Sequence, residues 1–253
     1  MRFLFMVEPA LIILTFFLAF GINLFSTLVG GRGAVMVPLL MFLGFSPQTA
    51  IATNRLSALS GMAALFEFHK QGYVKWRLGL FLAVFAGIGS AIGSFFVLQL
   101  DSDILEKGIG IIILLSLPMF LLRPNAGLKE RKVKLTKLKQ TGGAVMMVFL
   151  GTLGGFFSTT GVWFSWVYIF YYGMTFIQRA ATGKVVGLFM VSFSLVLFIP
   201  AGIINWPVAI SMLIGGGLGS WVSARNAKKL GNEKIRYLFL IVMLLIAFKI
   251  LLL

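Results

Sequence analysis

Long stretches without a charged residue constrain this chain most. They run from Pro9 to Gly31, Leu78 to Leu100, Gly108 to Leu122, Thr141 to Gln178 and Val185 to Ala224. Such stretches are long enough to cross the roughly 30 Å of hydrocarbon in a bilayer. Only helices and closed barrels are stable there, and the alternation that is typical of barrel strands is missing. The sequence therefore predicts an all-α polytopic integral membrane protein with about eight to ten transmembrane segments.

The charged residues lie in short gaps between the apolar stretches. The chain has 22 Lys and Arg against 7 Asp and Glu, but only 11% of its residues are charged. Basic residues in such gaps indicate membrane loops rather than a nucleic-acid surface, so no nucleic-acid partner is expected. The most basic gap, residues 123–140, is interpreted as a cytoplasmic linker between a first transmembrane repeat, 1–122, and a second, 141–253.

Side chains for common enzyme chemistry are scarce. The chain has no cysteine and a single histidine, His69. Thiol catalysis, iron–sulfur clusters and histidine-rich metal centres are therefore not expected, and neither is a cofactor. An enzyme is disfavoured on the same grounds, because no apparent pair of buried acids offers general acid–base chemistry.

The two halves repeat each other with an offset of about 130 residues, a length typical of half a transporter. Each half reads as a long apolar stretch, a break, a short apolar piece and three further spans. The short pieces are Ala34–Phe45 and Val162–Tyr172, which are too short to cross a bilayer alone. The repeat pairs are Gly33 with Gly161, 52–55 with 181–184, Gly72 and Trp76 with Gly202 and Trp206, and 89–90 with 219–220.

Five segments in each half predict that the second half is inverted relative to the first. The charges of equivalent turns support this. The turn His69–Arg77 is basic and the next turn, from Asp101, is acidic, whereas Gly202–Trp206 is uncharged and Arg225–Arg236 is basic. The positive-inside rule then places the basic turns and the linker in the cytoplasm and both termini outside. The alternative is eight spans in two parallel halves.

The breaks are the first candidate for a binding site. They are Gly30-Gly31-Arg32-Gly33 and Ser158-Thr159-Thr160-Gly161, and each precedes a short helix. The start of a helix offers unpaired N–H groups and a positive dipole end, which attract anions. The hydroxyls and Arg32 can add further hydrogen-bond donors. The simpler interpretation is that these glycines only let helices pack closely.

Arg55 and Lys184 are the second candidate, because they are repeat equivalents in apolar surroundings. A cation there costs about 3 kcal/mol or more unless it is paired or hydrated. Two such cations from opposite halves could compensate a bound anion, with Thr53, Asn54 and Thr182 as orienting groups. The alternative is that both cations extend to the membrane surface from helix starts.

Several of these motifs resemble the TauE/SafE family of membrane permeases, the sulfite exporters. In the first half they are Gly30-Gly31-Arg32-Gly33 with Pro38, 49–54 and 72–76, and in the second half 151–155 through Gly161, 180–184 and 203–206. The resemblance covers nearly the whole chain and implies movement of sulfite, organosulfonates or related small anions across a prokaryotic plasma membrane. This sequence departs from the family pattern by Arg32 in the first break and by hydroxyl residues in the second.

We therefore expect a transporter of small sulfur-containing anions, embedded in the bilayer and bound to its substrate between the repeats. The alternatives are a membrane scaffold or insertase-like protein, and a transporter of another small anion such as a carboxylate. A scaffold explains the hydrophobicity but not the duplicated breaks with paired cations.

Overall fold

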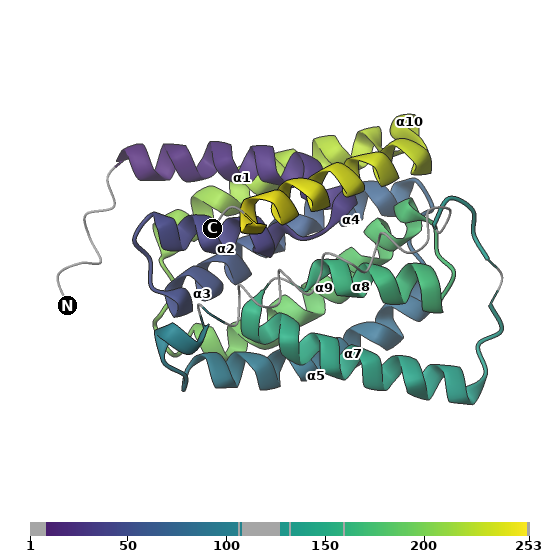
Figure 1. Cartoon of the computed structure of the whole chain (residues 1–253), viewed down its shortest axis with the longest axis horizontal. Coiled ribbons are helices and arrows are strands. Elements are labelled where there is room, and N and C mark those ends of the chain that lie inside the picture. Colours follow the sequence, from purple (N-terminus) through teal and green to yellow (C-terminus); the bar gives the residue numbers. More distant parts are fainter. Residues whose placement is uncertain (1–8, 106, 108–126, 132, 159, 252–253) are drawn as a thin grey trace.

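The computed structural model describes residues 9–105, 107, 127–131, 133–158 and 160–251. Every regular element in these ranges is helical, which confirms the predicted all-α class (Figure 1). The first-half elements are α1 (Pro9–Val29), α2 (Arg32–Phe42), α3 (Pro47–Ser57), η1 (Ala58–Ser60), α4 (Gly61–Lys70) and α5 (Trp76–Val97). The second-half elements are α7 (Lys137–Phe157), α8 (Gly161–Trp166), η3 (Val167–Tyr171), α9 (Phe176–Phe198) and α10 (Trp206–Leu251).

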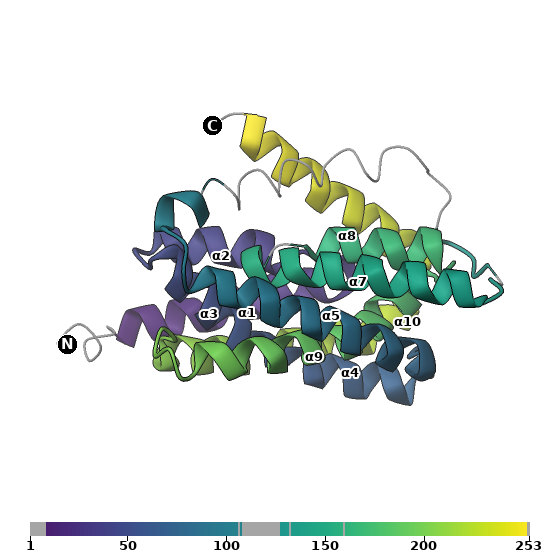
Figure 2. The same ribbon diagram turned by 90° about the horizontal axis from the view of Figure 1, so that it is seen from below.

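Within the described residues, five helices are long and apolar enough to cross a membrane: α1, α5, α7, α9 and the first part of α10. The other segments that the sequence predicts to cross the membrane are not single long helices in the described chain. α3, η1 and α4 follow one another without a loop over residues 47–70, and α10 is two helices joined at Gly231, where φ is 69°. Figure 2 shows the last part of α10 leaving the bundle at an angle. The crossing predicted at 108–122 lies outside the described residues.

The short helices lie where the glycine-rich breaks predict them. α2 has 11 residues, about 16 Å of helix, and its counterpart consists of α8 and the π-helical turn η3. Gly30 and Gly31 precede α2 with φ of 87° and 75°, and Ser158 ends α7 with φ of 59°. This left-handed conformation interrupts a helix, and Ser158 is the only residue other than glycine that adopts it in the described chain.

Local sequence also explains where the long helices begin. Thr136 caps α7 by accepting a hydrogen bond from the Lys139 amide. Thr175 and Gln178 form a reciprocal capping box at the start of α9. Because α7 begins at Lys137, the last four residues of the predicted linker form its first turn, and the described linker ends at Thr136.

Long helices of one half pack against long helices of the other half. α1 packs mainly along α10, and α7 packs mainly along α5. Glycines allow this close approach: a Cβ atom on Gly89 or Gly93 of α5 would overlap the backbone of α7, and one on Gly215 or Gly219 of α10 would overlap that of α1. Small residues serve the same purpose in other membrane helix pairs.

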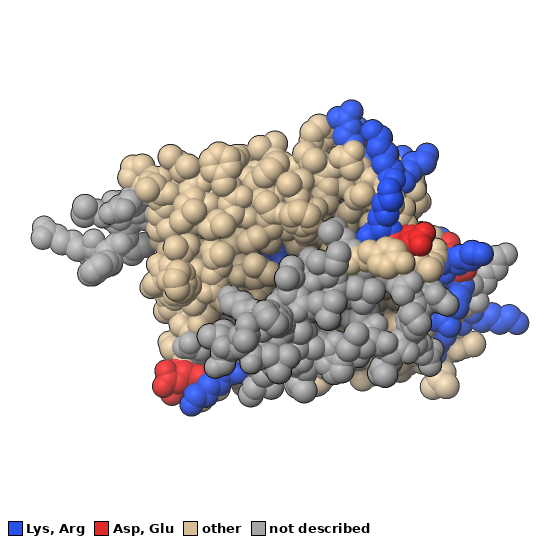
Figure 3. Space-filling view, turned by 45° about the horizontal axis from the view of Figure 1, so that its top comes forward, with Lys and Arg blue, Asp and Glu red and all other residues tan. Residues whose placement is uncertain are grey.

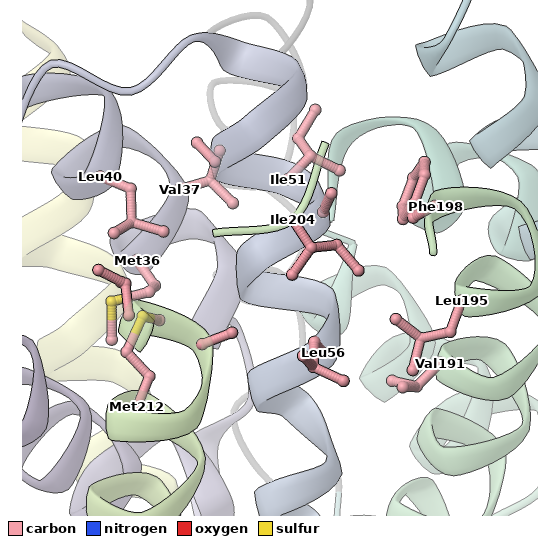
Figure 4. Close-up of a cluster of buried hydrophobic side chains, with 14 of the residues drawn as sticks. Met36, Val37, Leu40, Ile51, Leu56, Val191, Leu195, Phe198, Ile204 and Met212 are labelled. Atoms are coloured by element: carbon pink, nitrogen blue, oxygen red, sulfur yellow. The ribbon is translucent and has the colours of Figure 1, made fainter. Parts of the chain in front are cut away.

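An apolar cluster joins the two halves around α2 and α3. Figure 4 shows side chains of the first half, including Met36, Leu40 and Ile51, close to Phe198 and Met212 of the second. On the outside, large apolar residues such as Phe17 and Val196 remain exposed, as expected for helices in contact with lipid.

Most charged side chains on the face shown in Figure 3 gather at the two ends of the molecule. Three predicted basic segments meet at one end. Lys75 forms a 3.0 Å ion pair with Glu130 of the linker, Gln71 Nε2 donates to the Ala224 carbonyl at 3.0 Å, and Asn232 Nδ2 donates to the Leu128 carbonyl at 3.4 Å. The prediction that these segments share one side of the membrane is consistent with these contacts.

Candidate functional site

The two helix breaks lie in direct contact. A Cβ atom on Gly33 would overlap the carbonyl oxygen of Ser158, and one on Gly161 would lie 2.7 Å from the Gly31 nitrogen. Asn54 Nδ2 donates a hydrogen bond to Ser158 Oγ at 3.0 Å across the same contact. The two breaks, one from each half of the chain, thus meet in the structure.

A cavity of about 210 Å³ lies beside this contact, between residues of both halves. It has room for a small anion together with water, since one water molecule occupies about 30 Å³ in the liquid. Nine of the twelve predicted site residues line it: Gly31, Arg32, Gly33, Asn54, Arg55, Ser158, Thr160, Gly161 and Lys184. Of the other three, Thr159 lies outside the described residues.

The remaining two, Thr53 and Thr182, do not line the cavity. Thr53 Oγ1 accepts a hydrogen bond from the Asn205 amide at 3.1 Å, and Thr182 Oγ1 accepts one from the Lys75 amide at 3.1 Å. Asn205 and Lys75 directly precede α10 and α5, so each threonine holds the start of a helix from the opposite half. The interpretation of these two residues as orienting groups for a ligand therefore lacks a structural basis.

Arg55 is buried and turned toward a helix end. Its Nη2 donates to the carbonyl oxygen of Gly154 in the last turn of α7, which belongs to the other half. Arg179 has the matching role: its Nη2 donates to the carbonyl oxygen of Val29, the last residue of α1. Basic side chains satisfy carbonyls at helix C-termini in this way, and the negative end of the helix dipole offsets part of their charge.

Arg32 and Lys184 differ from this pair because their partners in the described chain are hydroxyls. Arg32 Nη2 donates to Ser57 Oγ at 2.6 Å, and Lys184 Nζ lies 3.5 Å from Thr27 Oγ1. Arg32 Nε and Nη1 are buried without a hydrogen-bond partner among the described residues. Both side chains keep accessible surface, whereas those of Arg55 and Arg179 are almost wholly buried.

Sequence reasoning missed Arg179 as a cavity residue and treated it as part of a helix start. A signal was present, because Arg179 and Lys184 are the only charged residues between Thr141 and Ala224. Polar groups of α1, η1, α8 and η3 were also missed; they are Asn23, Ser26, Thr27, Ser60, Ser165 and Tyr168.

Among the described residues, the cavity contains positive charge without a matching acid. None of the described acidic residues, Glu67, Asp101, Asp103, Glu130 and Glu233, lines it. A buried cation is stabilised by a counter-charge that also forms hydrogen bonds with it. A bound anion would be that counter-charge for the cations of this cavity. The chemistry of the lining is thus suited to binding an anion rather than a cation.

Comparison with known proteins agrees with this fold. The family model described as "Sulfite exporter TauE/SafE" matches residues 15–250. A "Probable membrane transporter protein" of Haemophilus influenzae is 30% identical over 89% of this chain and 89% of its own length. The "Probable membrane transporter protein YfcA" of Escherichia coli K12 is 28% identical over 98% of this chain and 92% of its own. No solved structure matches.

The family and these bacterial relatives confirm several predictions made from the sequence. They support a transporter rather than an enzyme, and a multi-pass location in a prokaryotic plasma membrane. The match covers both halves and both helix breaks. The chain therefore belongs to the sulfite exporter TauE/SafE family of membrane transporters.

Proposed function

We propose that this transporter moves a small sulfur-containing anion, such as sulfite or an organosulfonate, and binds it in the cavity where the two halves meet. One observation carries the proposal: Arg32 and Lys184 line the cavity, their partners among the described residues are hydroxyls, and no described acid is there to compensate them. An anion would supply the missing charge. Sulfur oxyanions fit because they present several oxygen acceptors to such donors.

The anion must exchange its hydration for protein donors. The first two residues of α2, Arg32 and Gly33, offer backbone N–H groups that have no partner within the helix, and Ser158 and Thr160 offer hydroxyls. The guanidinium of Arg32 retains Nε and Nη1 as donors that no described group uses. These groups come from both halves, so the ligand would bridge them.

We further propose that the halves are inverted repeats with the basic end in the cytoplasm. α1 and α7 run in opposite directions in Figure 1, and their packing partners, α10 and α5, are equivalents in the repeat. The contacts of Arg55 with Gly154 and of Arg179 with Val29 likewise each join one half to the other. Inverted repeats around a central site support alternating access by movement of one half against the other.

A binding screen with purified protein tests the substrate class. Sulfite, sulfate, thiosulfate, taurine, sulfoacetate and carboxylates are compared by thermal shift, because a ligand that binds only the folded state stabilises it. We expect sulfur oxyanions to raise the melting temperature. If only carboxylates stabilise the protein, the sulfur-containing substrate is ruled out and the alternative, a carboxylate transporter, is favoured.

Transport of labelled sulfite into proteoliposomes tests the mechanism. Lys184→Ala should weaken binding by about 1.5 to 3 kcal/mol, roughly 10- to 150-fold, because it removes a charged donor from a buried site. The matched control is Lys75→Ala, since Lys75 is 42% exposed and pairs with Glu130 outside the cavity. Absence of transport and binding for every anion would favour a scaffold or insertase-like role instead.

A further inference from the structure

The cavity contains four cations, and the structure divides them into two kinds. Arg55 and Arg179 each donate to the carbonyl at the end of a broken helix. That end carries a partial charge of about −0.5 from the helix dipole, which offsets part of each arginine's charge. Arg32 and Lys184 have hydroxyl partners, which carry no net charge.

The surroundings of these last two residues increase the positive potential. Arg32 begins α2, whose N-terminus carries a partial charge of about +0.5. Arg32, Arg179 and Lys184 line the same cavity. The described acidic residues all lie outside the cavity. Arg32 and Lys184 are therefore the two cavity cations whose described partners carry no negative charge.

From this inventory we propose that the site selects doubly charged anions, with Arg32 and Lys184 as the two residues that set this valence. The inference rests on the proposed function and narrows its substrate class. A singly charged anion would leave one partly buried cation uncompensated, whereas a dianion neutralises both. A zwitterion such as taurine would bring a further positive charge into the cavity and should be rejected.

Sulfate and methanesulfonate provide a matched pair of probes. Both are tetrahedral at sulfur and present oxygen acceptors, but at neutral pH sulfate carries two charges and methanesulfonate one. Their affinities for the purified full-length protein are measured by calorimetry at fixed ionic strength. We expect sulfate to bind about 10- to 150-fold more tightly, the range for one charged hydrogen-bonding contact.

Variants of the two cations show whether these residues cause the preference. In Lys184→Gln and in Arg32→Gln the ratio of the two affinities should fall toward one, because a single unpaired cation remains. Arg32→Lys should keep the preference, since it keeps the charge. Lys75→Gln, which removes a cation outside the cavity, should change neither affinity. Two glutamine variants are used so that the test survives if one of them fails to fold.

The outcomes separate this inference from the function on which it rests. Equal affinity of the wild-type protein for the two probes would overturn the valence selection and leave anion transport standing. A preference for sulfate that persists in both glutamine variants would overturn the assignment to Arg32 and Lys184. If neither these probes nor sulfite bind, the proposed function fails and the inference fails with it.

Discussion

Arg55 of the first half donates a hydrogen bond to the carbonyl oxygen of Gly154 in the second half. Arg179 of the second half makes the reciprocal contact with Val29 of the first. Each broken helix thus ends against an arginine from the opposite half. We therefore assign Arg55 and Arg179 a positioning role, in which they hold the two breaks together beside the cavity.

This role predicts a loss of stability when either arginine is removed. Arg55→Ala and Arg179→Ala should each lower the free energy of unfolding by about 1.5 to 3 kcal/mol, because a charged hydrogen bond is lost and a buried carbonyl loses a donor. Thermal unfolding of the purified protein in detergent measures the effect.

Two lysine variants serve as controls for the arginine variants. Lys184→Met should leave the melting temperature of the ligand-free protein unchanged or raise it, since it removes a cation that has no charged partner in the described chain. Lys75→Ala should cost at most about 1 kcal/mol, because its ion pair with Glu130 is exposed. Melting temperatures of the arginine variants equal to that of the wild type would rule out the positioning role.

A second prediction concerns the contact between the breaks. Gly33→Ala should destabilise the protein and abolish transport, because its Cβ would overlap the backbone of Ser158, which has little room to move. Gly21→Ala in α1 is the control: no described atom outside the helix's own backbone lies within 4 Å of its Cβ position, and alanine favours helix by about 0.5 to 1 kcal/mol. Sulfite uptake and melting temperature are measured for both. A fully active Gly33→Ala protein would mean that the breaks are not in contact.

Much of this arrangement could be predicted because its causes are local in the sequence. The absence of charge over long stretches indicates membrane helices, and clustered glycines indicate where those helices break. The short helices, predicted at Ala34–Phe45 and Val162–Tyr172, occur at Arg32–Phe42 and at 161–171. The site residues were predicted from the alignment of the two halves, and nine of the twelve line one cavity.

The roles of individual cations could not be predicted in this way. Arg55 and Lys184 are equivalent in the repeat, yet the structural counterpart of Arg55 is Arg179, five residues before Lys184. Which carbonyl a side chain reaches depends on how the halves pack, and hydropathy and spacing do not contain this information. The roles of Thr53 and Thr182 could not be predicted either, because they depend on the amides of Asn205 and Lys75, which only the packing of the halves brings near.

A third prediction follows from the position of Thr53. Thr53→Val should lower the melting temperature, because the Asn205 amide loses its acceptor at the start of α10, and a lost cap of this kind costs about 0.5 to 2 kcal/mol. Thr53→Ser should retain stability because it keeps the hydroxyl. Affinity for sulfite should be unchanged in both variants, since Thr53 does not line the cavity. Weaker binding by a normally stable Thr53→Val protein would return Thr53 to the binding site.

The last prediction is the orientation of the chain in the membrane. Reporter fusions at Gly127 and Gly231 should both report a cytoplasmic position, because the linker and the turn after α10's first part meet the basic His69–Arg77 turn at one end of the molecule. A fusion at Ser102 should report the outside, since Ser102 lies with Gln48 at the start of α3, whereas His69 lies in the last turn of α4. Opposite positions for Gly127 and Gly231 would contradict both the packing and the inverted halves. Reversal of all three reporters would keep the fold and contradict only the positive-inside assignment.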